Sequence, residues 1–322
     1  MRVLLFVSCM AAAASACAAA GAGGYPSRPI RVVVTFPPGG PTDIIARAVA
    51  QKLSDSFGQP VVVDNRAGAG GNIGMDIVAK APPDGYTIVE SSFGPLVISP
   101  FVYSKLPYDP VKDLTPITLA AASWFFLAVH PSVPARSVKE LIAAAKAKPG
   151  GYLFASAGNA TPSHLAGALF QAVAGIQLTH VPYKGSATSL PALIAGEAQI
   201  AIESPPLLVP QVKAGKLRGL AAARPGRSPL LPDVPTMKES GLSGMEVGSW
   251  YGFHAPAGTP KAIVDRLHAE MVKAMNAPDV RERFAGVGAD TIADSPAEFA
   301  AFISAELKKW GTVIRAAGVK LE

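Results

Sequence analysis

The chain has 322 residues, enough for two domains or one large one with a substantial core. Apolar residues make up 49% of it and charged residues only 16%, which excludes a disordered chain. Its net charge of +6 comes from scattered Lys and Arg residues, with no basic block interleaved with aromatic residues, so we expect no nucleic-acid partner.

Residues 1–24 are typical of a secretory signal peptide: Arg2, an apolar stretch too short to span a membrane, and then small residues. Cys9 and Cys17 both lie in this segment, so cleavage would remove them and exclude a disulfide scaffold and a cysteine nucleophile. The stretch "ASAC" loosely resembles a lipoprotein box, although Ala14 stands where Leu is usual. A lipid anchor at Cys17 is therefore the alternative to an exported, soluble protein.

Short apolar runs alternate with helical patterns along the rest of the chain. Several runs are almost continuously hydrophobic, as expected of parallel strands that are buried on both faces. This alternation predicts an α/β protein with mostly parallel sheets. The expected strands span residues 30–36, 60–65, 86–92, 152–158, 178–183, 198–204, 217–223 and 249–256.

Several expected helices carry start signals. Ser137–Glu140 forms a capping box that Ser295–Glu298 repeats, and Thr259 is expected to cap a helix that starts at Pro260. The apolar positions of the last two helices recur at helical spacing, which predicts core rather than ligand contacts. These predicted core residues are Ile263, Leu267, Met271, Met275, Phe299, Phe302, Ile303 and Trp310.

The stretch "TFPPGGPTD" (Thr35–Asp43) joins the first expected strand to a helix. Gly39 and Gly40 allow close approach of the backbone, Thr42 can cap the helix, and Asp43 would lie in its first turn. Free backbone N–H groups at a helix start bind anions without a basic side chain. The alternative is an ordinary strand–helix turn with two glycines.

A second stretch, Phe154–Gly175, repeats this layout, with Thr161 as the expected cap and Pro162 at the first helical position. Two such helix starts could face each other across a cleft and hold an anion between them. A carboxylate fits better than a phosphate, because neither turn has the length or the lysine of a P-loop. Short hydrogen-bonding side chains in this turn are Ser156, Asn159, Thr161 and Ser163.

Other chemistry finds little support in the sequence. The glycines of Asn65–Gly74 miss the dinucleotide pattern by one position, so a rim loop is expected there and no nucleotide cofactor. The five histidines lack metal-ligand spacing, and no G-x-S-x-G elbow is present. Ser163 and His164 are adjacent, which in a helix points them apart, so His164 is expected to donate at the helix start or to pack.

With these turns in view, the sequence resembles the substrate-binding proteins of tripartite tricarboxylate transporters, the Bug family of Gram-negative bacteria. The resemblance extends over about residues 25–320. The stretches that carry it are "YPSRPIRVVV", "FPPGGPTDIIAR", "GQPVVVDNRAGAGGNIG", "APPDGYTI", "LPYDPVKDLTPI", "VPYKG", "KAGKLRGLA", "LPDVPT" and "WYGFHAPAGTP".

This resemblance implies a type II periplasmic-binding-protein fold, in which two α/β lobes joined by two crossovers close over a ligand, usually a carboxylate. Lobe 1 would comprise residues 25–120 and 245–322, and lobe 2 residues 121–244. The protein would be a periplasmic, non-catalytic monomer without cofactor or metal that hands a small organic carboxylate to integral-membrane transporter subunits. The alternatives are a periplasmic enzyme acting on a small carboxylate and a ligand-presenting sensor subunit.

The resemblance also implies a site. Backbone groups of Phe36–Asp43 would grip a carboxylate with the help of ordered water, Asp43 would orient water or a ligand amine, and Ser156–His164 would face them from the other lobe. The expected ligand-binding residues are Phe36, Pro38, Gly39, Gly40, Thr42, Asp43, Ser92, Ser156, Ala157, Gly158, Asn159, Thr161, Ser163, His164, Tyr183 and Glu203.

Two positions depart from the family pattern. Ala192 and Glu203 stand where relatives commonly carry Asp. Because Glu extends about one methylene further than Asp, these departures bear on pocket size and on the choice of ligand, which the shared motifs do not identify.

Overall fold

The computed structural model describes residues 24–316 and 318. The expected signal peptide up to residue 23, with Cys9 and Cys17, lies outside the described residues. None of the helices that the structure describes is long and apolar enough to cross a membrane.

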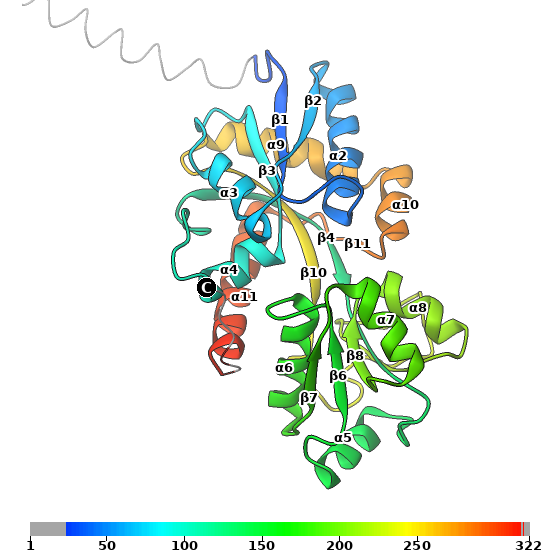
Figure 1. The fold of residues 1–322 in the computed structure, drawn as a ribbon. Coiled ribbons are helices and arrows are strands. Elements are labelled where there is room, and N and C mark those ends of the chain that lie inside the picture. The colour runs from blue at the N-terminus through cyan, green and yellow to red at the C-terminus, as the bar shows by residue number, and fades with distance from the viewer. Residues whose placement is uncertain (1–23, 317, 319–322) are drawn as a thin grey trace, which may run out of the picture.

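Two sheets form the centres of two lobes (Figure 1). The first lobe holds six strands in the order β11-β4-β10-β3-β1-β2, and the second holds five in the order β7-β6-β8-β5-β9. The strands are β1 (Ile30–Val34), β2 (Val61–Asn65), β3 (Thr87–Ser92), β4 (Leu114–Trp124), β5 (Phe126–Val129), β6 (Leu153–Ser156), β7 (Thr179–Pro182), β8 (Ile200–Glu203), β9 (Arg218–Ala222), β10 (Gly248–Pro256) and β11 (Asp290–Thr291).

Helices cover both sheets. In the first lobe these are α2 (Pro41–Phe57), η1 (Ala69–Gly71), α3 (Asn72–Ala79), η2 (Gly94–Ile98), α4 (Ser99–Val102), α9 (Lys261–Met275), α10 (Pro278–Gly286) and α11 (Pro296–Ala316). In the second lobe they are α5 (Val138–Ala147), α6 (Pro162–Ala174), α7 (Ser186–Ala195) and α8 (Pro205–Lys213).

All eight expected strands are present, but the expectation of mostly parallel sheets is wrong. The pairs β1–β2, β1–β3, β6–β7 and β6–β8 are parallel, whereas every antiparallel pair involves β4, β5 or β10. These are the strands on which the chain passes between lobes. Parallel neighbours within one lobe must be joined by a crossover, which is usually a helix. A strand that enters from the other lobe needs no such crossover, so it can pair antiparallel with the strands of its sheet.

The two crossings lie side by side. The chain leaves the first sheet at Trp124 and enters the second at Phe126, and it returns to the first sheet at Gly248. The Phe125 N–H donates to the Val247 carbonyl at 2.9 Å, which ties one crossing to the other. The expected limits of the lobes, at residues 120–121 and 244–245, remain a prediction.

Hydrophobic core lies on both faces of the first sheet. Successive residues of β1 point to opposite faces: Val32 and Val34 pack with α2 and α9, and Val33 packs with α3 and α11. The predicted core is confirmed, with Phe302 only partly buried, although α9 begins at Lys261 rather than Pro260. Thr259 does not cap α9, because its hydroxyl donates to the Pro256 carbonyl at 2.8 Å.

Candidate functional site

Two adjoining cavities of about 280 and 430 Å³ lie between the lobes, and we call them together the cleft. They share four residues: Pro41, Pro162, Ser249 and Tyr251. Pro41 starts α2 in the first lobe and Pro162 starts α6 in the second, so the two helix starts border one space.

The smaller cavity is lined by both lobes and the larger one mostly by the first. The residues of the smaller cavity are Pro41, Ser123, Phe125, Ala157, Thr161, Pro162, Ser163, Ser186, Glu203, Ser204, Pro206, Ser249, Tyr251 and Val287. The residues of the larger one are Phe36, Pro37, Pro38, Gly40, Pro41, Thr42, Ser92, Phe93, Gly94, Pro162, Ser249 and Tyr251.

The loop before α2 differs from its expected geometry in one respect. Gly40, not Thr42, is the residue that precedes the helix, and Pro41 takes the first helical position because its φ suits a helix and it has no N–H to leave unpaired. Thr42 is buried within the first turn. Gly39 has φ of +88°, a left-handed conformation that favours glycine.

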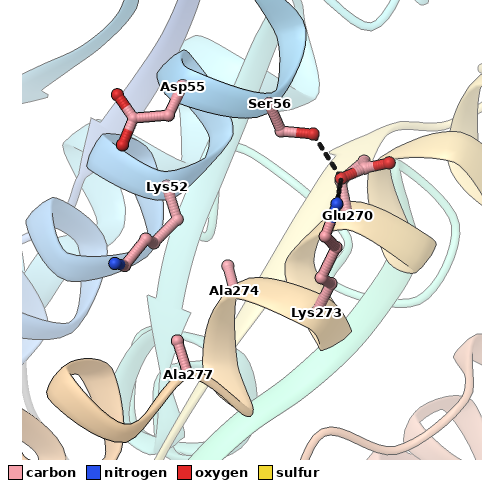
Figure 2. Close-up of a pocket in the computed structure, with 7 residues that line it drawn as sticks. All are labelled: Lys52, Asp55, Ser56, Glu270, Lys273, Ala274 and Ala277. Atoms are coloured by element: carbon pink, nitrogen blue, oxygen red, sulfur yellow. Dashed lines mark hydrogen bonds and ion pairs between the residues drawn. The ribbon is translucent and has the colours of Figure 1, made fainter.

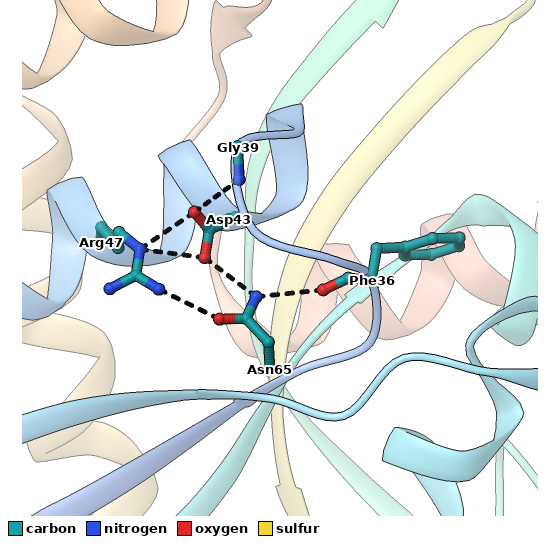
Figure 3. A network of polar contacts seen from close by, with 5 residues as sticks. All are labelled: Phe36, Gly39, Asp43, Arg47 and Asn65. Carbon is teal, nitrogen blue, oxygen red and sulfur yellow. Dashed lines mark hydrogen bonds and ion pairs between the residues drawn. The ribbon is translucent and has the colours of Figure 1, made fainter.

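Asp43 was expected to orient water or a ligand amine, but its side chain is buried beneath this loop and lines neither cavity (Figure 3). Its carboxylate accepts hydrogen bonds from Gly39 N–H at 3.0 Å, Arg47 Nε at 2.9 Å and Asn65 Nδ2 at 2.9 Å. Asn65 Nδ2 also donates to the Phe36 carbonyl at 3.0 Å. Burial alone would raise the pKa of Asp43, but these hydrogen bonds hold the pKa below its ordinary value.

Asp43 therefore fixes the loop instead of facing the cleft. Figure 3 shows the Phe36 ring directed away from the carboxylate, while Gly39 and Asn65 point toward it. With Gly39 N–H engaged, the backbone N–H groups of Gly40, Thr42 and Asp43 have no acceptor within the described part of the chain. Free donors at a helix start are groups that bind anions in proteins.

The second loop is built differently. Thr161 caps α6 as expected and accepts from His164 N–H at 3.4 Å. The loop also uses its own side chains to satisfy its backbone: Ser163 Oγ accepts from Ala157 N–H at 3.0 Å, and Ser156 Oγ accepts from Gly158 N–H at 3.1 Å. This loop therefore offers hydroxyl groups to the cleft, and few free N–H groups.

A serine–histidine pair underlies the second loop. Ser156 Oγ lies 2.6 Å from His180 Nε2, and the His180 ring stacks on that of His164 with ring centroids 4.0 Å apart. Burial, together with the neighbouring His164, lowers the pKa of His180 to about 4, so this ring is neutral at physiological pH. Ser156 is 1% exposed, and neither it nor either histidine lines the cleft.

Glu203 is the carboxyl group that lines the cleft. It ends β8, is 7% exposed, and borders the smaller cavity. Its Oε1 accepts from Ser204 N–H at 2.8 Å and its Oε2 from Ser186 Oγ at 3.4 Å. Burial raises the pKa of Glu203, and these hydrogen bonds oppose the rise. Ala192, the other departure from the family pattern, lies in α7 and lines neither cavity.

The expected site residues divide into those that line the cleft and those that do not. Those that line the cleft are Phe36, Pro38, Gly40, Thr42, Ser92, Ala157, Thr161, Ser163 and Glu203. Those that line neither cavity are Gly39, Asp43, Ser156, Gly158, Asn159, His164 and Tyr183. Asn159 is exposed, and the Tyr183 N–H donates to the Ser156 carbonyl at 3.1 Å.

Sequence reasoning missed several residues of the cleft. Ser204 precedes α8 as Thr161 precedes α6, and Ser186 is the first residue of α7. The polar residue types that are common at helix starts therefore also pointed to them. Ser249 and Tyr251 come from β10, whose placement at the crossing had no local signal. Burial, and after it the charges of Glu90 in the first lobe and Glu203 in the second, raise the pKa of the Tyr251 hydroxyl.

Charge is distributed unevenly around the cleft. Among residues 24–316, no Lys, Arg or His side chain lines either cavity, and no group of three or more His, Cys, Asp or Glu side chains could hold a metal ion.

A separate hollow of about 330 Å³, between the C-terminal parts of α2 and α9, carries Lys52, Asp55, Glu270 and Lys273 (Figure 2). Ser56 in this hollow donates a hydrogen bond to Glu270. The hollow shares no lining residue with the cleft.

Comparison with known proteins points to one family. The model of the family described as "Tripartite tricarboxylate transporter family receptor" matches residues 45–319. Protein BugT of Bordetella pertussis is 38% identical over 322 residues, which is 100% of this chain and 99% of BugT.

Two solved structures of relatives contain carboxylates. Rpa4515 of R. palustris with adipate is 35% identical, with a TM-score of 0.75 over 92% of this chain and 99% of that one. MatC of Rhodopseudomonas palustris with bound malate is 32% identical, with a TM-score of 0.71 over 90% of this chain and 100% of that one.

Proposed function

The chain belongs to the tripartite tricarboxylate transporter receptor family, and from this we propose that its cleft captures a small organic carboxylate for delivery to the membrane subunits of such a transporter. Proteins of this family are periplasmic solute-binding proteins. We propose that this chain acts in the periplasm as a monomer, without a cofactor and without catalysis.

The observation that carries the proposal is the free backbone at the start of α2. Gly40 and Thr42 line the cleft, and their N–H groups have no acceptor in residues 24–316. The helix dipole adds partial positive charge at the same place. An anion is held there by oriented donors, with no cationic side chain. The relatives that bind adipate and malate support a carboxylate as this anion.

The position of the cleft supports capture by closure of the lobes. Both lobes line the smaller cavity, and the crossings at Phe125 and Val247 lie together beside it. A rotation about two short, adjacent crossings brings Pro162 and the serines of the second lobe toward the start of α2. Closure removes the ligand from water, which strengthens each hydrogen bond to it.

The alternative of an enzyme receives less support. The Ser156–His180 pair has the distance of a nucleophile and its base, but both side chains lie behind the loop and line neither cavity. A sensor subunit would bind the same ligand and differ only in its membrane partner, so the geometry of the cleft favours neither partner over the other.

Titration calorimetry of the exported protein, freed of bound ligand by unfolding and refolding, tests the proposal. We expect binding of small carboxylates with one site per chain, and no binding of phosphate or ATP. At about 100 times the dissociation constant, the ligand should stabilise the fold by about 2.7 kcal/mol. Tight binding of phosphate with no binding of any carboxylate, or chemical conversion of a bound carboxylate, would refute it.

A further inference from the structure

The two walls of the cleft carry different polar groups. On the side of the first lobe, backbone N–H groups of Gly40 and Thr42 remain free. On the side of the second lobe, Ala157 and Gly158 N–H groups are taken by serine hydroxyls. Pro206, at the second position of α8, removes a further donor that α2 keeps at Thr42, because proline has no N–H.

Glu203 lies where the helix starts of the second lobe converge. It accepts from the N–H of Ser204, the residue that precedes α8, at 2.8 Å and from Ser186 Oγ, at the start of α7, at 3.4 Å. Ser163, in the first turn of α6, lines the same cavity. The partial positive charge at the N-termini of α7 and α8 therefore falls on this side chain. A carboxyl of the protein itself occupies the place where an anionic ligand would otherwise meet these helices.

The carboxyl remains within reach of a ligand. Glu203 lines the smaller cavity together with Pro41 and Tyr251 of the first lobe, and its contacts leave acceptor capacity on both oxygens. No Lys, Arg or His among the described residues lines this cavity to balance a second negative charge. A ligand carboxylate next to Glu203 would place two like charges in a buried, weakly screened space.

We propose that Glu203 determines specificity by selecting a ligand that has a carboxylate at one end and a hydrogen-bond donor, a hydroxyl or an ammonium, at the other. The carboxylate binds at the start of α2, and the donor binds to Glu203. The apolar middle of the ligand packs against Phe36, Pro38 and Phe93 of the larger cavity. Dicarboxylates are disfavoured. This inference rests on the proposed capture of a carboxylate.

The test uses sets of straight-chain acids of equal length, from about four to eight carbons, that differ only at the far end: hydroxyl, ammonium, methyl or a second carboxylate. Calorimetry on the exported protein gives the dissociation constant of each. We expect the hydroxy or amino acid to bind at least about tenfold more tightly than the diacid of the same length, a difference of about 1.4 kcal/mol. The hydroxyl and ammonium arms identify which donor is preferred.

We define the selectivity ratio as the dissociation constant of the diacid divided by that of the hydroxy or amino acid of the same length. Glu203→Gln keeps the size of the side chain and removes its charge, so it should bind diacids better and lower this ratio to about threefold or less. Glu282→Gln, an exposed residue of α10, is the control of equal charge change and should leave the ratio unaltered. If Glu203→Gln folds poorly, Ser186→Ala is the second variant. It frees one Glu203 oxygen and keeps the carboxyl, so it should alter the selectivity ratio between diacids and hydroxy or amino acids.

The outcomes separate the two proposals. If the wild-type protein binds diacids as tightly as hydroxy and amino acids at every length, the role of Glu203 is refuted. Carboxylate capture then still stands. An unchanged ratio in both Glu203→Gln and Ser186→Ala overturns it as well. If no acid of any set binds to the wild type, carboxylate capture itself fails, and the inference with it.

Discussion

Gly39 N–H donates to the Asp43 carboxylate at 3.0 Å, so the residue that starts the tight turn is tied to the first turn of α2. The same carboxylate binds Arg47 and Asn65, and Asn65 reaches the Phe36 carbonyl. One buried side chain thus holds both ends of the loop whose backbone lines the cleft. The function of this side chain is to position the free backbone N–H groups of the loop.

Replacement of Asp43 should therefore cost stability as well as affinity. Asp43→Ala removes charge-assisted hydrogen bonds, each worth about 1.5–3 kcal/mol, and leaves Asn65 with an unsatisfied donor. We expect a loss of about 2–4 kcal/mol in the free energy of unfolding and a weaker ligand complex. Urea unfolding and calorimetry measure the two effects. Asp55 is an exposed residue near the other end of α2, so Asp55→Ala should change neither stability nor affinity. Wild-type stability in Asp43→Ala would contradict the positioning role.

Gly40 offers a contrast with its neighbour. Its backbone is extended, and a Cβ there would meet nothing closer than the Pro37 carbonyl at 3.9 Å, so Gly40→Val should fold normally. Because Gly40 lines the larger cavity, the new side chain should reduce affinity for a carboxylate by about tenfold or more. If a folded Gly40→Val protein binds carboxylates normally, the start of α2 is not part of the binding site.

Gly39 is the matched control for that substitution. At φ of +88°, Gly39→Val forces a branched side chain into the left-handed region, at a cost of about 1–3 kcal/mol. We therefore expect Gly39→Val to lower the midpoint of thermal unfolding and Gly40→Val to preserve it. Equal destabilisation of the two variants would indicate that the turn has a different backbone conformation.

Much of this architecture was predictable from local sequence. The eight expected strands occur, Ser137 and Ser295 cap their helices, and Thr161 and Pro162 start α6 as their types suggest. Each of these features depends on a few adjacent residues, through side-chain period or cap chemistry. They suffice to identify an α/β protein with two loops of similar layout.

Features that depend on distant contacts were not predictable. The stretch from β4 into β5 has no turn signal, because the chain changes sheets at Phe125 without reversing direction sharply. Asp43 has the residue type expected in a first helical turn, yet its role depends on Asn65, which is contributed by β2. Tyr251 enters the cleft only because β10 pairs with both β3 and β4.

A second buried carboxyl predicts a distinctive pH dependence. Glu90 on β3 is fully buried, and neither of its oxygens has a hydrogen-bond partner among the described residues. Burial, and to a lesser extent the charge of Asp43, raises the pKa of Glu90 well above its ordinary value. The folded protein therefore holds this proton more tightly than the unfolded chain does. Stability contributed in this way is complete below the ordinary glutamate pKa and declines as the pH rises toward the raised pKa.

Glu90→Gln removes this titration while retaining the size of the side chain. The free energy of unfolding of the variant, relative to wild type, should increase as the pH rises above the ordinary glutamate pKa, by up to about 1.4 kcal/mol per pH unit. Taking the difference cancels the contribution of Asp294, whose pKa is raised to about 6 mainly by burial. A difference that stays constant with pH would show that Glu90 keeps the same pKa in the folded and unfolded states.

The crossings between lobes provide the last prediction, at Gly248. This residue starts β10 opposite Trp124, the last residue of β4. A Cβ on Gly248 would collide with the Ser123 carbonyl and would come within 2.9 Å of Trp124 Cα, so the two crossing strands approach closely only because this position has no side chain. Backbone atoms cannot rotate away as a side chain can. Gly248→Ala should therefore destabilise the protein by about 1–3 kcal/mol.

The same substitution should also disturb ligand capture, because Ser249 and Tyr251 follow directly on β10 and line both cavities. We expect Gly248→Ala to bind a carboxylate more weakly even at temperatures where it is fully folded. Gly226→Ala, at a glycine with no heavy atom within 4 Å of the added Cβ, should match wild type in both stability and affinity. Denaturant unfolding and calorimetry on the two variants measure this contrast. If Gly248→Ala retains wild-type stability, the crossing strands can separate freely, and close contact at Gly248 does not hold the lobes in register.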